Sequence, residues 1–153
     1  MDFTFGIITN GEEKDRVDKA IESIICQNVP KFQIVIVGGE NEWGDIKQVN
    51  HYPFDETIKN GWITAKKNII TAYAKYDNVV YMHDYFILDD NWYQGFLDFG
   101  DDWDVCMNKI TGSDGERYID WISIGDIELI KSGYRDGALV PYDYDKTEAM
   151  YVS

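Results

Sequence analysis

The sequence predicts an α/β fold in which helices cover both faces of a mostly parallel β-sheet. Short β-rich apolar runs alternate with segments of helical period, which is typical of βαβ units. One run, Phe32–Val37 (FQIVIV), is almost entirely apolar, as expected for a strand that is buried on both faces. At 153 residues, 44% of them hydrophobic, the chain can bury one core. We therefore expect a single three-layer α/β/α domain over residues 1–153.

The first part of the chain supplies one βαβ unit. Phe3–Thr9 (FTFGIIT) is a short β-rich run before the Asn10-Gly11 turn signal, so we expect a strand here. Lys14–Asn28 carries its apolar side chains on one face of a 3.6-residue period, which predicts a helix. The strand Phe32–Val37 completes the unit. Residues 40–60 are polar and irregular, and we expect them to hold an edge element and a loop.

The second part continues the alternation. Gly61–Tyr76 has an apolar stripe beside a basic one, which predicts a helix, and Asn78–Met82 follows at once as a strand. Trp92–Phe99 is expected to form a short helix with an aromatic face, and Trp103–Asn108 (WDVCMN) another strand. Thr111–Gly115 (TGSDG) predicts a tight turn.

Composition restricts the partners and the compartment. With 28 acidic and 14 basic side chains the net charge is −14, and no basic stripe offsets it, so neither nucleic acid nor an anionic membrane surface is expected as a partner. No apolar stretch reaches the length of a membrane span, and Met1-Asp2-Phe3 leads directly into the first strand without a leader. Cys26 and Cys106 are the only cysteines, form no metal-spaced pair and are expected to be reduced and buried. A cytoplasmic protein is therefore expected.

The end of the chain leaves two interpretations open. Met150-Tyr151-Val152, just before the last residue, is similar to the start of another strand rather than to a tail. Residues 1–153 are either the whole domain or a C-terminally truncated part of a longer one.

The most informative segment is Val79–Tyr85 (VVYMHDY), an apolar run that stops at a carboxylate and is followed by Asp89-Asp90. In open α/β sheets, ligands bind outside the carboxyl ends of the strands. Asp84 is therefore placed to hold a divalent cation or a ligand hydroxyl. The alternative is that Asp84 only caps the turn after the strand.

These segments resemble family 2 glycosyltransferases of the GT-A fold, which transfer a sugar from a nucleotide-diphosphate donor. Ile7-Ile8-Thr9-Asn10 is similar to the end of the family's first strand, Ser23–Gln27 (SIICQ) to its helix signature, and Ala65–Asn68 (AKKN) to its Ala-Arg-Asn element. His83-Asp84-Tyr85 falls where the family has Asp-x-Asp. The resemblance covers nearly the whole chain and implies the family's N-terminal, nucleotide-binding part, with a Rossmann-like GT-A sheet.

The resemblance implies nucleotide contacts from the ends of the first two strands and from the second helix. The implied nucleotide-binding residues are Thr9, Asn10, Gly38, Glu40, Lys67 and Asn68. Glu40 could take over the ribose contact that the family's Val-Asp-Asp supplies, or Gly38 and Gly39 could serve only a tight turn. Lys67 keeps the charge of the family's arginine without its planar fork. Alternatively, Lys66 and Lys67 are the solvated face of the helix.

The resemblance also implies a cation site. Asp84 would hold Mn²⁺ or Mg²⁺ against the donor diphosphate, and the cation would neutralise the leaving group. His83 could be a ligand that favours Mn²⁺, a donor to a phosphate oxygen, or a packed histidine at a strand end.

The implied activity is an inverting transfer of sugar from a UDP- or GDP-type donor to a carbohydrate or other hydroxyl acceptor. No catalytic base is assigned, because the family places it downstream of the point where this chain ends. The alternative is a non-catalytic glycan-binding or interaction module, in which some of the 11 tyrosines and 5 tryptophans form a stacking face. No Gly-x-Gly-x-x-Gly follows the first strand, which disfavours a dinucleotide-binding oxidoreductase.

Two later segments carry weaker signals. Arg117–Trp121 (RYIDW) could contact donor sugar or acceptor, although such a cluster more often forms a surface ion pair over an aromatic core. Asp143-Tyr144-Asp145 matches a metal motif by letter only, because its flanks are turn-like.

Overall fold

The computed structural model describes residues 1–40, 43–106, 108–115, 134–135 and 138–139. The chain divides into two compact units, Met1–Gly100 and Asp101–Ser153, each described by itself. The single domain expected for residues 1–153 stays a prediction. Among the described residues, no helix has both the length and the apolar character that crossing a membrane requires.

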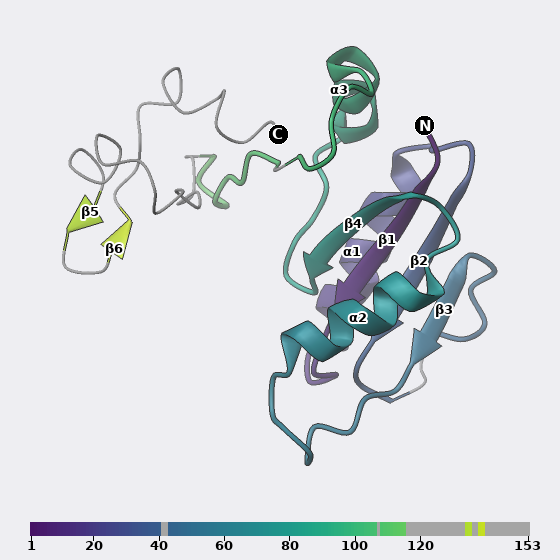
Figure 1. The fold of residues 1–153 in the computed structure, drawn as a ribbon, viewed down its shortest axis with the longest axis vertical. Coiled ribbons are helices and arrows are strands. Elements are labelled where there is room, and N and C mark those ends of the chain that lie inside the picture. Colours follow the sequence, from purple (N-terminus) through teal and green to yellow (C-terminus); the bar gives the residue numbers. More distant parts are fainter. Residues whose placement is uncertain (41–42, 107, 116–133, 136–137, 140–153) are drawn as a thin grey trace. The chain divides into compact units, whose positions relative to one another are not determined.

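The first unit is built on a four-stranded, all-parallel β-sheet (Figure 1). Its strands are β1 (Phe3–Ile8), β2 (Phe32–Val37), β3 (Val49–Tyr52) and β4 (Asn78–His83). They lie in the order β3-β2-β1-β4. Ile8 is opposite Val37 on one side and His83 on the other, so these three strands end level with one another. We call this end of the sheet the carboxyl edge and define it by Thr9, Gly38 and Asp84, the residues that directly follow β1, β2 and β4.

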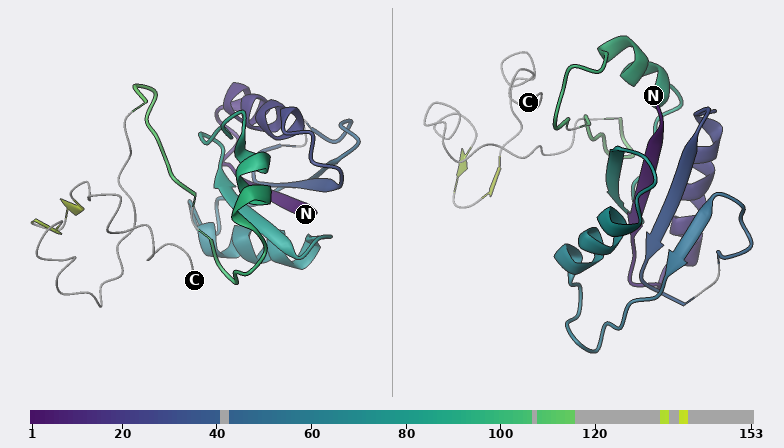
Figure 2. Two further views of the ribbon diagram at one scale, coloured as in Figure 1. Left: turned by 90° about the horizontal axis from the view of Figure 1, so that it is seen from above. Right: turned by 45° about the vertical axis from the view of Figure 1, so that its right-hand side comes forward.

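Helices α1 (Lys14–Cys26) and α2 (Ile63–Tyr73) lie on opposite faces of the sheet, as two views show (Figures 1 and 2). On the α2 face, Gly6 leaves room for Ile70: a Cβ on Gly6 would lie 2.4 Å from Ile70 Cγ2. Because side chains alternate along a strand, Phe5 and Ile7 point to the α1 face, and both are fully buried. The α/β class and the parallel sheet predicted from the sequence are confirmed.

Helix α3 (Trp92–Phe99) is fixed by aromatic contacts and by one glutamine. The rings of Trp92 and Phe96 lie 5.2 and 5.6 Å from the ring of Phe3. At the end of α1, the Gln27 amide donates to the Asp89 carbonyl (2.8 Å) and accepts from the Tyr93 N–H (3.0 Å). The predicted short aromatic helix is confirmed, and Gln27 ties α1 to the segment that follows β4.

The expectation for the stretch after α3 was partly wrong. Within the described part of Trp103–Asn108 there is no strand, and Cys106 forms only an isolated bridge. Val105, in the middle of this run, is 59% exposed, unlike a residue at the centre of a buried strand. The turn at Thr111–Gly115 is confirmed, with the Gly115 N–H donating to the Gly112 carbonyl (3.0 Å).

Two short strands were not expected from the sequence. Strands β5 (Tyr134–Arg135) and β6 (Ala138–Leu139) pair antiparallel. The strand anticipated at Met150-Tyr151-Val152 lies outside the described residues.

The expected burial of the cysteines was also wrong. Cys26 is exposed and Cys106 is partly exposed, and neither forms a disulfide. The buried face of α1 is formed by residues at helical spacing, Val17, Ala20, Ile21 and Ile24. Cys26 lies off that face.

Candidate functional site

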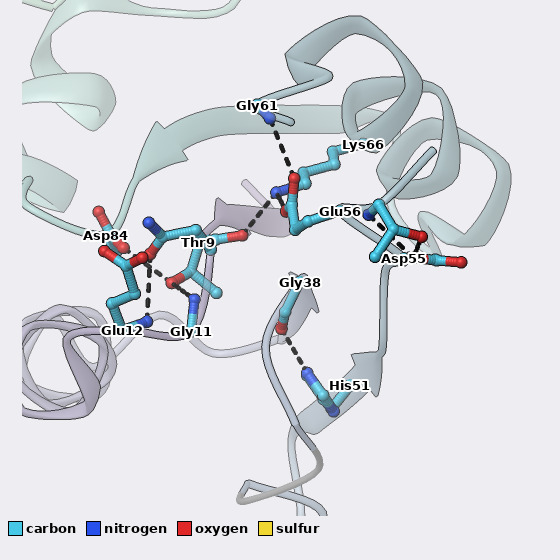
Figure 3. A network of polar contacts seen from close by, with 12 residues as sticks. Thr9, Gly11, Glu12, Gly38, His51, Asp55, Glu56, Gly61, Lys66 and Asp84 are labelled. Carbon is cyan, nitrogen blue, oxygen red and sulfur yellow. Dashed lines mark hydrogen bonds and ion pairs between the residues drawn. The ribbon is translucent and has the colours of Figure 1, made fainter. Parts of the chain in front are cut away.

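The strand order reverses at β1. The chain passes from β1 through α1 to β2 and on to β3, whereas β4, reached through α2, lies on the other side of β1. In open α/β sheets, ligands bind beyond the carboxyl ends of the strands at such a reversal. Thr9 and Asp84 directly follow the two strands that flank it, and Figure 3 shows both in the same polar network.

A hydrogen bond joins Thr9 and Asp84, which lie 75 positions apart. Thr9 is buried, and its hydroxyl accepts the Gly11 N–H (3.0 Å) while it donates to Asp84 Oδ2 (2.7 Å). A hydroxyl has a single proton, so this proton must point at the carboxylate. Asp84 therefore does more than cap its own turn.

The second oxygen of Asp84 remains available. Asp84 is partly exposed and its backbone N–H donates to the Ile8 carbonyl (3.1 Å), which fixes its main chain to β1. Among the described residues, Oδ1 has no hydrogen-bond partner. The site thus presents one carboxylate oxygen, with the other held by Thr9.

Lys66 is the buried cation of the carboxyl edge. It is 2% exposed, and its ammonium group donates to the Thr9 carbonyl (2.7 Å) and to Glu56 Oε1. The other oxygen of Glu56 accepts the Gly61 N–H (3.0 Å). Burial acts to raise the pKa of Glu56, but the hydrogen bonds from Lys66 and Gly61 and the charge of Lys66 outweigh it and hold this pKa below its ordinary value. Lys66 and Glu56 therefore form a charged pair.

Lys67 and Asn68, implied by the resemblance to contact a nucleotide, are exposed on α2. The Lys67 ammonium lies 5.5 Å from the centre of the Tyr81 ring. The interpretation of both lysines as a solvated face is wrong for Lys66. The usable signal was that Lys66 precedes the buried Ile70 by four positions, which places the two on one helical face.

Gly38 permits close contact between the loops after β1 and β2. It is buried with φ +111°, and a Cβ there would lie 1.9 Å from the Thr9 carbonyl oxygen and 3.2 Å from Lys66 Nζ. Gly39 also has positive φ, +70°, so the tight turn expected at Gly38-Gly39 is present. Glu40, the expected ribose contact, is exposed beyond this turn.

Two further polar residues shape the loops at this edge. Asn10 is exposed, and its side-chain oxygen accepts the Glu12 N–H (3.1 Å), so it orders the loop before α1. His51 Nε2 donates to the Gly38 carbonyl (2.7 Å), which connects β3 to the glycine turn. Sequence reasoning missed both His51 and Glu56, because each lies in the polar stretch that carried no motif.

His83 is partly buried, and its ring stacks on Tyr85 with the ring centres 5.2 Å apart. Burial lowers the pKa of His83, Lys67 and Lys66 lower it further, and Asp84 opposes them. The imidazole is therefore neutral at pH 7, the form that can act as a metal ligand.

The metal-ligating side chains at this edge fit a cation that binds together with a phosphate ligand better than a cation held by the protein alone. In the part of the chain that the structure describes, no three His, Cys, Asp or Glu side chains are grouped so as to hold a metal ion. Asp84 and His83 offer at most two protein ligands. Mg²⁺ sites built on one or two carboxylates take their other ligands from phosphate and water, so these residues fit a cation bound together with a diphosphate.

Arg117–Trp121 and Asp143-Tyr144-Asp145 lie outside the described residues, and no role is assigned to them. Comparisons of the chain with known protein families, with curated proteins and with solved structures find no match.

Proposed function

We propose that this chain is a nucleotide-sugar-binding domain, similar to the N-terminal part of family 2 glycosyltransferases with a Rossmann-like, three-layer GT-A sheet. It binds a UDP- or GDP-type sugar donor through Mn²⁺ or Mg²⁺ and transfers the sugar to a hydroxyl acceptor in the cytoplasm. The observation that carries this proposal is the Thr9–Asp84 pair at the reversal of strand order, with Asp84 Oδ1 available to a ligand.

Two other features support the proposal. The motifs that resemble the family follow one another in the family's order, from Ile7-Ile8-Thr9-Asn10 to His83-Asp84-Tyr85. Thr9 and Asp84, from the first and the last of these motifs, are in direct contact. The parallel pairing of β1 with β4 brings these two motifs together at the carboxyl edge.

In this proposal each residue of the carboxyl edge has a defined task. Asp84 and the neutral His83 hold the cation, which when bound supplies positive charge to the leaving diphosphate. Thr9 orients Asp84 through its hydroxyl, and Lys66 orients Thr9 through its carbonyl oxygen. Inverting transfer also needs a carboxylate within hydrogen-bond reach of the acceptor hydroxyl, and no described residue is assigned that role.

The test is calorimetric titration with UDP and GDP, each with and without Mn²⁺. Wild type is compared with Asp84→Asn and with the control Asp77→Asn, which removes the same charge at an exposed position just before β4, at the opposite end of that strand. We expect Mn²⁺-dependent binding in wild type and in the control, weakened at least about tenfold in Asp84→Asn, which corresponds to about 1.4 kcal/mol. Wild type that binds no nucleotide diphosphate in the presence of Mn²⁺ contradicts the proposal.

A second candidate function, a glycan-binding module without catalysis, is favoured by one observation. Tyr85 is 57% exposed immediately after Asp84 and stacks on His83, which gives a flat aromatic surface beside the site. Such surfaces bind sugar rings. Screening against glycans in EDTA, with Tyr85→Ala as the variant, separates the two functions: metal-free glycan binding that this variant loses supports the module.

A further inference from the structure

We propose that Lys66 forms an anion-binding site at the carboxyl edge, separate from the cation site at Asp84. The Glu56 carboxylate occupies this site in the free protein, and a phosphate group of the bound donor replaces it there. The identification of the anion as a donor phosphate rests on the proposed function. The two charged groups of the site, Lys66 and Glu56, lie outside the predicted nucleotide and metal sets.

The first step concerns the charge of Lys66. Its side chain is 2% exposed, and a buried ammonium group is stable only when it is paired and hydrogen-bonded. Its acceptors are the Thr9 carbonyl oxygen and the Glu56 carboxylate, and only the second is charged. Any state in which Glu56 leaves therefore requires another anion in its place.

The second step concerns the segment that carries Glu56. Residues 53–62 connect β3 to α2, and most of them are exposed. Three of the side-chain hydrogen bonds in this segment are internal: Thr57 donates twice to Asp55, and Gly61 donates once to Glu56. Phe54 packs against the core beside Ile70. The ion pair to Lys66 is the polar link between the segment and the carboxyl edge, so Glu56 can be displaced without loss of a sheet hydrogen bond.

The third step concerns position. Lys66 Nζ lies beside the ends of β1 and β2, because it bonds the Thr9 carbonyl and lies 3.2 Å from where a Cβ of Gly38 would be. Asp84 bonds the same threonine through its hydroxyl. Thr9 thus stands between a carboxylate suited to a cation and an ammonium group suited to an anion (Figure 3). A ligand with two phosphate groups matches this arrangement.

The exchange itself is electrically balanced. When a phosphate oxygen replaces the Glu56 carboxylate, Lys66 keeps a hydrogen-bonded negative partner throughout. Glu56, already 25% exposed, becomes solvated. The wild-type site is therefore self-occupied, and free anions must compete with a carboxylate that is covalently held nearby.

The test uses inorganic pyrophosphate in EDTA, so that no cation can bridge it to Asp84. Calorimetry compares wild type, Glu56→Gln, and Glu56→Gln combined with either Lys66→Met or the control Lys75→Met, an exposed lysine just beyond the end of α2. We expect Glu56→Gln to bind pyrophosphate at least about tenfold more tightly than wild type. We expect Lys66→Met, but not Lys75→Met, to abolish this gain.

Equal pyrophosphate affinity in wild type and Glu56→Gln, or a gain that survives Lys66→Met, overturns the inference. If Glu56→Gln does not fold, Glu56→Asp shortens the internal ligand while it keeps the charge, and it must bind pyrophosphate more tightly than wild type. If these pyrophosphate results are not obtained but Mn²⁺-dependent nucleotide binding is, only the Lys66 site is refuted and the proposed function stands.

Discussion

Replacing Gly38 with alanine tests the contact between the loops after β1 and β2. The new Cβ would lie 1.9 Å from the Thr9 carbonyl oxygen, whereas ordinary contacts begin near 3.4 Å, so the two backbones must separate by roughly 1.5 Å. A side-chain rotation cannot relieve this clash, because the obstacle is main chain. In Gly38→Ala, positive φ destabilises the folded state by about 1–2 kcal/mol and the overpacking by about 1–3 kcal/mol. The lower conformational entropy of the unfolded chain offsets about 0.4–1 kcal/mol of this loss. We expect the free energy of unfolding to fall by about 2–4 kcal/mol.

Gly61→Ala is the matched control for this variant. Gly61 also has positive φ, +63°, but nothing lies within 4 Å of a Cβ there. Gly61→Ala should therefore lower the free energy of unfolding by only about 1 kcal/mol, from the strain of positive φ alone. Urea unfolding followed by tryptophan fluorescence measures both variants. Equal losses in the two would refute the reasoning that backbone contact, rather than φ, makes Gly38 necessary.

Two further predictions concern charge. Lys66→Met should lower the free energy of unfolding by about 2–4 kcal/mol, because Glu56 and the Thr9 carbonyl lose their donor. The control Lys67→Met, at an exposed position, should change it by about 1 kcal/mol or less. Similar losses for the two variants in urea titrations argue against a structural role for Lys66. The pKa of His83 is lower folded than its ordinary 6.5, so the native state binds fewer protons than the unfolded one. The contribution of His83 to the free energy of unfolding should therefore be fully present above pH 6.5 and be lost as the pH falls below it. A free energy of unfolding whose pH dependence is the same in His83→Gln as in wild type contradicts this assignment.

The elements best predicted from the sequence are those in which a run of apolar residues has one place to pack. Phe32–Val37 forms a strand over the predicted residues, because its last four residues are buried between β1 and β3. Trp92–Phe99 matches because its aromatic face has one place to pack, against Phe3. The predicted strand at Trp103–Asn108 is absent from the described residues because β propensity in a short run forms a strand only where the run is also buried, and Val105 is 59% exposed.

The candidate site shows the same division. Thr9 and Asp84 could be assigned to one edge of the sheet from sequence, because parallel strands end at the same edge. The hydrogen bond between them could not be predicted from the sequence, because it depends on how the two loops turn after the strands end. Lys66 and Lys67 are neighbours about 100° apart on a helix, so a letter motif cannot decide which of them is buried. The four-residue spacing to Ile70 favours Lys66, and the position of α2 on the sheet, with Ile70 against Gly6, sets that choice.

The charges at the carboxyl edge explain why a cation and an exchangeable carboxylate belong in one proposal. Asp84 contributes one negative charge, Glu56 cancels Lys66, and His83 is neutral at pH 7, so the edge is net negative in a chain of net charge −14. A diphosphate would be repelled by this edge as it stands. A cation at Asp84 reverses the local sign, and departure of Glu56 adds the positive charge of Lys66. The two steps act on opposite sides of Thr9, so metal-dependent nucleotide binding should strengthen further in Glu56→Gln, whereas loss of binding there would mean that Glu56 supports the site rather than occupies it.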